Sequence, residues 1–279
     1  MPIKHVNGVD IYYEETGRGF PLVWSHEFGG DYRAWEPQVR YFSRRYRVIT
    51  YNHRGYAPSS VLKQADAYTH QHLIEDLHHL LRGLGIAQAH VGGLSLGGNV
   101  ALNFGLAHPE MTKSLVVAGC GSGTVNREAF LEQTAANADA LEARGIEALV
   151  QNFEKLATRK AFRAKDPRGW QEFLTYVREH SAPACAHIAR GVIMGRKTIF
   201  ELEAKLKALT VPTLVMVGDQ DEPCIEPALF MRSRIPHAGL VVLPVSGHTI
   251  NIEEPALFNE HVAEFLTAVD SGRWGTWSA

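Results

Sequence analysis

Short apolar runs alternate with longer amphipathic stretches along most of this chain, and this alternation constrains the fold more than any other feature. Six runs have the length of a β-strand, at residues 21–25, 47–51, 89–93, 113–119, 213–218 and 239–244. Helical periodicity lies between most of them, at 70–84, 96–107, 226–234 and 255–268. Because parallel strands need long crossovers, the pattern predicts an α/β fold with a mostly parallel sheet and helices on both faces. Asn7-Gly8 predicts a tight hairpin turn that precedes the six apolar runs.

The alternation breaks between about residues 122 and 209. Only helical patterning occurs there, and strand patterning resumes at Val211-Pro212. We interpret residues 122–209 as a helical insertion between two strands of one sheet, so that residues 1–121 and 210–279 together form the core. A chain of 279 residues can bury a large core without a disulfide or metal staple.

The charge balance and the cysteines narrow the function classes. Lysine and arginine total 28 against 30 acidic residues, and this net charge of −2 predicts no binding of nucleic acid or of an anionic membrane. The three cysteines form no CxxC pair, which argues against a disulfide framework or a zinc ribbon. The first residues lack the apolar core of a signal peptide, and no stretch is apolar over the length of a membrane span. We therefore expect a cytoplasmic protein.

The segment GLSLGG, residues 93–98, is the strongest local signal for chemistry. It follows an apolar strand and precedes a helical stretch, which is the context of a nucleophile elbow. In such an elbow Ser95 occupies a strained turn, small residues at 93 and 97 leave room for it, and the Leu96 N–H at the helix start stabilises an oxyanion. The alternative is a glycine-rich turn that packs tightly or holds a phosphate.

A nucleophilic serine needs a base and a carboxylate that orients it. His248 lies in a loop after the last strand, where a parallel sheet presents functional side chains. Asp219, Asp221 and Glu222 follow the preceding strand. The order serine, acid, histidine is that of the α/β-hydrolases and differs from both unrelated serine-protease orders. The alternative for these acids is a polar loop that caps the next helix.

Four histidines, at positions 70, 72, 78 and 79, share one helical stretch with Glu75 and Asp76. Such a cluster suggests a metal, but no zinc signature such as HExxH accompanies it. We interpret these residues as a polar helix face and predict no metal site.

The motifs together resemble the α/β-hydrolase superfamily, in particular its branch of small-molecule esterases and enol-lactonases. The matching pieces are SHEFGG at 25–30, NHRGYAPS at 52–59, GLSLGG at 93–98, GDQDEP at 218–223 and GHTINIEEP at 247–255. The resemblance implies an eight-stranded, mostly parallel sheet, a helical cap over the active site formed by residues 122–209, and no cofactor. It implies a triad of Ser95, Asp221 and His248, and an oxyanion hole formed by the backbone N–H groups of Phe28 and Leu96.

Two positions depart from the family pattern. The loop that usually reads His-Gly-x-x-Gly has Glu27 between His26 and Phe28, with Gly29 beyond them, so a carboxylate stands beside the oxyanion hole. An ionised carboxylate aimed at that hole would oppose the reaction. We therefore expect Glu27 near the site but directed away from the oxyanion, held by Arg54 or His53, the alternative being a solvated side chain.

The second departure is Asn52, which replaces the usual aspartate of the next loop. Asparagine and aspartate make similar local hydrogen bonds, so we expect only a structural change.

A serine nucleophile predicts acyl transfer, here hydrolysis of a small carboxylic ester or lactone through an acyl-enzyme. Three alternatives stay open: a C–C bond hydrolase of ring-cleavage products, a cofactor-free oxygenase or perhydrolase, and a non-enzymatic ligand receptor. A basic stretch, residues 159–168, either reads a substrate carboxylate or forms a solvated helix face, which we favour. The expected partner is a small molecule, with homo-oligomerisation left open.

Overall fold

An eight-stranded sheet forms the centre of the computed structural model, which describes residues 2–275. Its spatial order is β1-β2-β4-β3-β5-β6-β7-β8. The strands are β1 (Ile3–Val6), β2 (Val9–Thr16), β3 (Phe20–Ser25), β4 (Tyr46–Tyr51), β5 (Ala89–Leu94), β6 (Thr112–Ala118), β7 (Thr213–Gly218) and β8 (Ala238–Leu243). The six strands from β4 to β8 in this order pair in parallel, and β2 pairs antiparallel to β1 and β4. The predicted mostly parallel sheet is confirmed.

The turn between β1 and β2 is the predicted hairpin. Asn7 and Gly8 have φ of 49° and 75°. Both values lie in the left-handed region that a two-residue hairpin requires and that asparagine and glycine tolerate.

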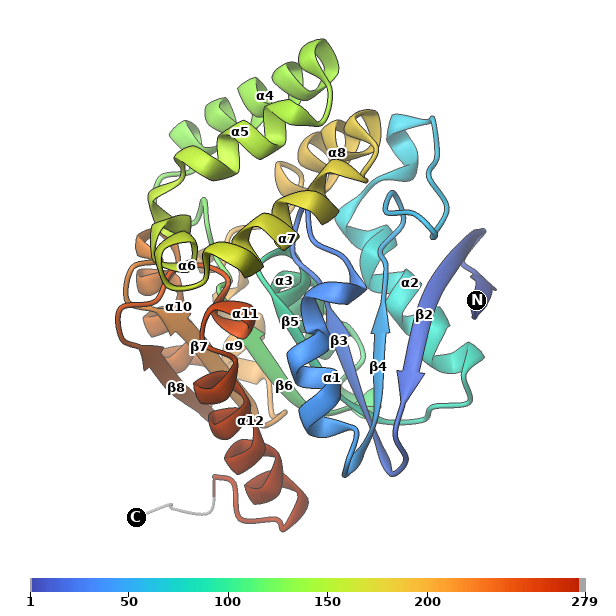
Figure 1. Ribbon diagram of the computed structural model, residues 1–279. Coiled ribbons are helices and arrows are strands. Elements are labelled where there is room, and N and C mark those ends of the chain that lie inside the picture. The colour runs from blue at the N-terminus through green and yellow to red at the C-terminus, as the bar shows by residue number, and fades with distance from the viewer. Residues whose placement is uncertain (1, 276–279) are drawn as a thin grey trace.

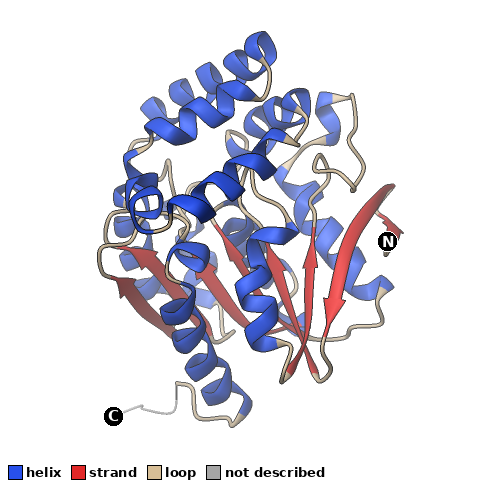
Figure 2. Ribbon diagram, viewed as in Figure 1, coloured by secondary structure: helices blue, strands red, loops and turns tan. Residues whose placement is uncertain are grey.

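Helices cover both faces of the sheet (Figures 1 and 2). One face packs against α2 (His70–Gly83), α3 (Leu96–Ala107) and α10 (Glu222–Arg234), and the other against α1 (Glu36–Phe42), α11 (Ile250–Glu253) and α12 (Pro255–Asp270). Neighbouring residues of one strand therefore enter opposite layers, as Val116 and Val117 do. This is why the central strands are apolar at consecutive positions.

Helices alone fill the chain between β6 and β7. They are α4 (Arg127–Arg144), α5 (Glu147–Lys155), α6 (Lys160–Lys165), α7 (Pro167–Arg178), α8 (Ala182–Ile188) and α9 (Glu203–Ala208), with the short turns η4 (Ala157–Arg159) and η5 (Ala189–Ile193) among them. Residues 119–212 are all described, and none of them is in a strand. In Figure 1 helices α4, α5 and α8 lie beyond one end of the sheet.

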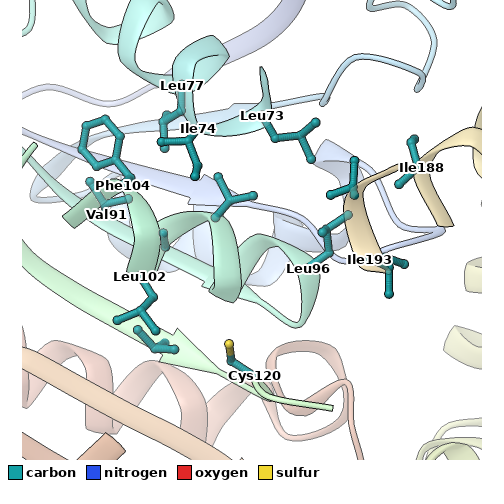
Figure 3. Close-up of a cluster of buried hydrophobic side chains, with 14 of the residues drawn as sticks. Leu73, Ile74, Leu77, Val91, Leu96, Leu102, Phe104, Cys120, Ile188 and Ile193 are labelled. Carbon is teal, nitrogen blue, oxygen red and sulfur yellow. The ribbon is translucent and has the colours of Figure 1, made fainter. Parts of the chain in front are cut away.

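A continuous apolar cluster joins this helical segment to the sheet. Figure 3 shows Leu73 and Leu77 of α2, Leu96 of α3, and Ile188 and Ile193 from the segment after α7 in one cluster. Shared burial of this kind fixes the segment against the helices that follow β4 and β5.

None of the helices in the described chain is long and apolar enough to cross a membrane.

Candidate active site

Ser95 occupies a strained turn between β5 and α3. Its φ is 57°, a left-handed value that a residue with a side chain rarely adopts, and its N–H donates to Ala118 O at 2.8 Å. A Cβ at Gly97 would collide with the Ser25 carbonyl, and a Cβ at Gly93 with the backbone of Gly97. The two glycines are therefore needed for the turn that presents Ser95 ahead of the helix.

His248 and Asp221 are brought together by the loops that follow β8 and β7. The imidazole Nδ1 lies 2.7 Å from Asp221 Oδ2, and both side chains are almost fully buried. A carboxylate is only an acceptor, so Nδ1 carries the proton and Nε2 has its lone pair free. The pair has the geometry of a general base with an orienting acid.

The neighbouring acids have other roles. Asp219 is exposed and accepts a hydrogen bond from the Ser246 N–H at 3.0 Å, which ties the loop of His248 to the end of β7. Glu222 is exposed in the first turn of α10. Asp221 is the one of the three that contacts His248.

The helical segment also holds the His248 loop. The backbone N–H of His248 donates to Thr158 O at 2.9 Å. The next N–H, of Gly247, donates to both carboxylate oxygens of Glu253 at 3.1 and 3.0 Å, and Lys165 Nζ lies 3.3 Å from the same carboxylate. Two contacts from residues 158–165 therefore set the position of the imidazole.

The loop after β3 carries Phe28, whose N–H is the second expected oxyanion donor. Beneath it His26 donates from Nδ1 to Glu27 O at 2.8 Å and accepts from the His53 N–H at Nε2 at 3.0 Å. Burial lowers the pKa of His26 to about 4, so the ring is neutral near pH 7 and makes both bonds at once. In the described chain neither the Phe28 nor the Leu96 N–H donates to a protein acceptor. The Gly29 N–H donates to Tyr56 Oη at 3.1 Å.

A cavity of about 370 Å³ joins these residues. Ser95, Phe28, Leu96, Asp221 and His248 line its core side. Ser95 Oγ has no hydrogen-bond partner within the described residues, so the hydroxyl is available to a molecule in the cavity. The opposite side comes from the segment between β6 and β7 and includes Phe153, Arg159 and Arg196.

Glu27 also lines the cavity, but its partner differs from the expected one. Its carboxylate forms a buried two-point ion pair with Arg159, with Nη1 to Oε1 at 3.2 Å and a shorter contact from Nη2 to Oε2. Arg54, one of the two expected donors, instead makes two bonds of 2.6 Å to Asp76. The prediction of a partner in residues 52–55 was wrong, because α2 supplies a buried carboxylate to Arg54 and the helical segment supplies a cation to Glu27. The solvated alternative is excluded, since Glu27 is 1% exposed.

The basic stretch divides into two parts. Four of its five cations are exposed, and among them Arg163 donates to Glu154 O at 2.8 Å while Lys165 binds Glu254 at 2.5 Å. Arg159 is buried, 4.8 Å from the ring centre of Phe153. The favoured interpretation as a solvated face was therefore wrong for Arg159.

Asn52 acts within its own loop. Its Oδ1 accepts from the Tyr32 N–H at 2.8 Å, and its Nδ2 donates to Ala57 O at 2.8 Å. The amide bridges two loops with an acceptor and a donor, and an aspartate would supply only the acceptor.

Two groups of potential metal ligands occur in the described chain. One is Asp221, Cys224 and His248, which shares the site above, and the other is Glu75, His78 and His79 on α2. The second group does not line the cavity. Asp76 beside it is buried against Arg54 and does not belong to a polar helix face.

Arg196 is a charged cavity residue that the sequence motifs do not indicate. It follows η5, is 8% exposed, and lies in a Gly-Arg-Lys turn whose polarity is typical of an exposed loop. Its burial depends on packing against Ser122 and Phe130, residues far away in the sequence. A local pattern carries no signal for such a contact.

Comparison with known proteins gives one family and several relatives. Residues 21–255 match the model of a family described as alpha/beta hydrolase fold. The chain is similar to 3-oxoadipate enol-lactonase 1 of Acinetobacter baylyi, 28% identical over 249 residues that cover 89% of each protein. It is similar to a protein of Azorhizobium caulinodans named as a carbamate hydrolase, RutD, with 26% identity over 97% of this chain and 100% of that protein. Among solved structures, a thermophilic esterase from Thermogutta terrifontis is similar with a TM-score of 0.84 at 25% identity, covering 96% of this chain and 98% of the esterase.

Proposed function

Because the chain belongs to the alpha/beta hydrolase family, we propose that it is a serine hydrolase that cleaves a small carboxylic ester or lactone through an acyl-enzyme. One observation carries the proposal: the strained Ser95 and the hydrogen-bonded pair of His248 and Asp221 line the same cavity. The relatives support this class, because their names describe hydrolysis of a lactone, a carbamate and an ester.

In the proposed reaction Ser95 Oγ attacks the substrate carbonyl. His248 Nε2 accepts the hydroxyl proton and then donates it to the leaving alcohol, while Asp221 keeps the proton on Nδ1 and stabilises the imidazolium. The N–H groups of Phe28 and Leu96 bind the oxyanion of the tetrahedral intermediate. Water, activated by the same histidine, then hydrolyses the acyl-enzyme.

The helical segment acts in this proposal as a cap. Its residues close the cavity opposite Ser95, and its Thr158 carbonyl holds the His248 loop. Excluding water from the cavity strengthens the electrostatic contribution of the oxyanion donors.

The direct test is turnover of 4-nitrophenyl esters of short acids by the wild type and by Ser95→Ala. We expect a burst of nitrophenol followed by steady turnover in the wild type, and a loss of about 10⁶ in kcat in the variant with an unchanged circular dichroism spectrum. A variant that keeps a substantial part of the wild-type rate would show that another residue is the nucleophile. If the wild type cleaved C–C substrates but neither esters nor lactones, the proposed substrate class would be wrong.

A further inference from the structure

Arg196 lines the cavity and has no counter-ion among the residues that the structure describes. Its side chain makes one hydrogen bond, from Nη2 to Ser122 O at 3.1 Å, and its guanidinium lies 5.9 Å from the ring centre of Phe130. Within the described residues, no carboxylate oxygen lies within 4.0 Å of this guanidinium, although the residue is 8% exposed. A guanidinium has five N–H donors, so most of its hydrogen-bonding capacity is unused by the protein.

Arg159, on the same side of the cavity, provides the contrast. It is buried to a similar degree, but both of its terminal nitrogens bind the carboxylate of Glu27. Its charge is therefore neutralised by the protein itself. Asp221 is committed to His248 in the same way. Of the two arginines that line the cavity in the described part of the chain, Arg196 is thus the one without a protein carboxylate.

Burying an unpaired cation is unfavourable unless a partner offsets the lost hydration. Consistent with this, burial lowers the pKa of Arg196, and the nearby Arg127 lowers it further. Arg127 donates from Nη2 to Met194 O at 2.5 Å and to Arg196 O at 2.9 Å. It therefore holds the backbone of the turn and does not neutralise the Arg196 guanidinium. A negative group that enters from the cavity would supply the missing partner.

We propose that Arg196 is an anion-binding residue of the substrate cavity, and that the substrate is an ester or lactone bearing a free carboxylate. The planar guanidinium binds a carboxylate through two parallel N–H···O bonds, and one unpaired cation matches a singly charged group. This inference rests on the proposed function, since it names the substrate class of that site. It assigns the choice of substrate to the helical segment and the chemistry to the core.

The test compares charged and neutral acyl groups of the same shape. The substrates are the 4-nitrophenyl hemiesters of succinate, glutarate and adipate, each paired with a neutral ester in which an isopropyl group replaces the carboxylate. The readout is the ratio of kcat/KM for the anionic ester to that for its neutral partner, after subtraction of spontaneous hydrolysis. We expect the wild type to prefer at least one anionic ester by more than about tenfold, the magnitude of a charge-assisted hydrogen bond.

Three variants locate the effect. Arg196→Met should lower the ratio by about 10- to 100-fold, chiefly through KM, and Arg196→Lys should lie between this variant and the wild type. Arg163→Met removes an exposed arginine outside the cavity and should leave the ratio unchanged. Thermal unfolding of each variant shows whether the loss of the bond to Ser122 O disturbs the fold.

Two results would overturn the inference. One is a wild type that shows no preference for any anionic ester. This result needs only the wild type, so it is informative even where Arg196→Met fails to fold. The other is an equal loss for charged and neutral esters in a folded Arg196→Met, which would mean that Arg196 only supports the turn at Ser122. Failure of the proposed function differs from both, because then neither kind of ester would be cleaved in a manner that depends on Ser95.

Discussion

The two walls of the cavity are built on different principles. On the core wall, Ser95, Asp221 and His248 follow the carboxyl ends of strands β5, β7 and β8, and backbone geometry at each strand end fixes the side chain. On the opposite wall, Arg159 and Arg196 come from short turns between helices. The carboxyl ends of parallel strands converge by topology, whereas turns between helices are placed only by packing. In our proposal the first wall carries the reaction and the second selects the substrate.

Polar contacts also connect the two walls, and they are concentrated at residues 158 and 159. Glu27 of the core binds Arg159 of the helical segment through a buried ion pair, and Thr158 O accepts from the His248 N–H. Residues 158 and 159 thus contact both the loop after β3 and the loop that carries His248. Within residues 2–275, Arg196 has no such tie to a charged group of the core, and we propose that its side chain binds a ligand.

We expect the largest effect from a substitution of Asp221, the proposed orienting acid on the core wall. Asp221→Asn leaves the amide unable to select the Nδ1–H tautomer of His248, and we expect kcat to fall by about 10⁴. The matched control is Asp219→Asn, which weakens one bond to the Ser246 N–H, and we expect it to lower kcat by no more than about tenfold. Steady-state kinetics on one ester compare the two. A larger loss in Asp219→Asn would assign the acid to the wrong residue.

The second largest effect is expected when the ion pair between Glu27 and Arg159, which connects the two walls, is broken. Glu27→Gln or Arg159→Met leaves one buried charge unpaired, so each should lower the free energy of unfolding by about 3–5 kcal/mol. The double variant removes both charges and should recover at least half of the summed loss. Urea unfolding of the four proteins gives the coupling free energy. Losses that simply add would mean that the two side chains do not act as a pair.

A third, smaller effect concerns His26, in the loop after β3, and the dependence of the free energy of unfolding on pH. The pKa of folded His26 is about 4 against 6.5 when unfolded, so between these values the unfolded chain binds a proton that the folded chain does not. The contribution of neutral His26 to the free energy of unfolding is therefore complete above pH 6.5 and is lost as the pH falls toward 4. Between pH 6.5 and about pH 5 the loss is about 2 kcal/mol. Urea midpoints across this range should show a shallower slope in His26→Gln, and an unchanged slope would place the titration elsewhere.

The smallest effect is expected on the outer surface of the helical segment. Neutralising Arg163 and Arg168 together should change kcat/KM for charged and neutral esters by less than about twofold, because both side chains are exposed and lie outside the cavity. A selective rise in KM for anionic esters would move the anion-binding role from Arg196 to this surface.

The same division explains what could be predicted from the sequence. Strand runs, the positive-φ hairpin at Asn7-Gly8 and the glycine turn around Ser95 are local patterns with one structural solution each, and the structure contains them. The partner of Glu27 was missed, because residue 159 is separated from it by more than one hundred positions and an arginine in a basic stretch carries no mark of burial. Arg196 was missed for the same reason. Charges that meet only through tertiary packing leave no periodic signal.

The measurement that tests the account most directly is the site of labelling by a fluorophosphonate, located by peptide mass mapping. We expect a single adduct, on the peptide that contains Ser95. It should be absent in Ser95→Ala and should form more slowly in His248→Ala. Two other serines are credible rivals in the structure: Ser122 lines the same cavity, and Ser25 Oγ lies 3.1 Å from His53 Nε2. An adduct on either of them, or an active protein that takes no label, would contradict the assignment of Ser95 as the nucleophile.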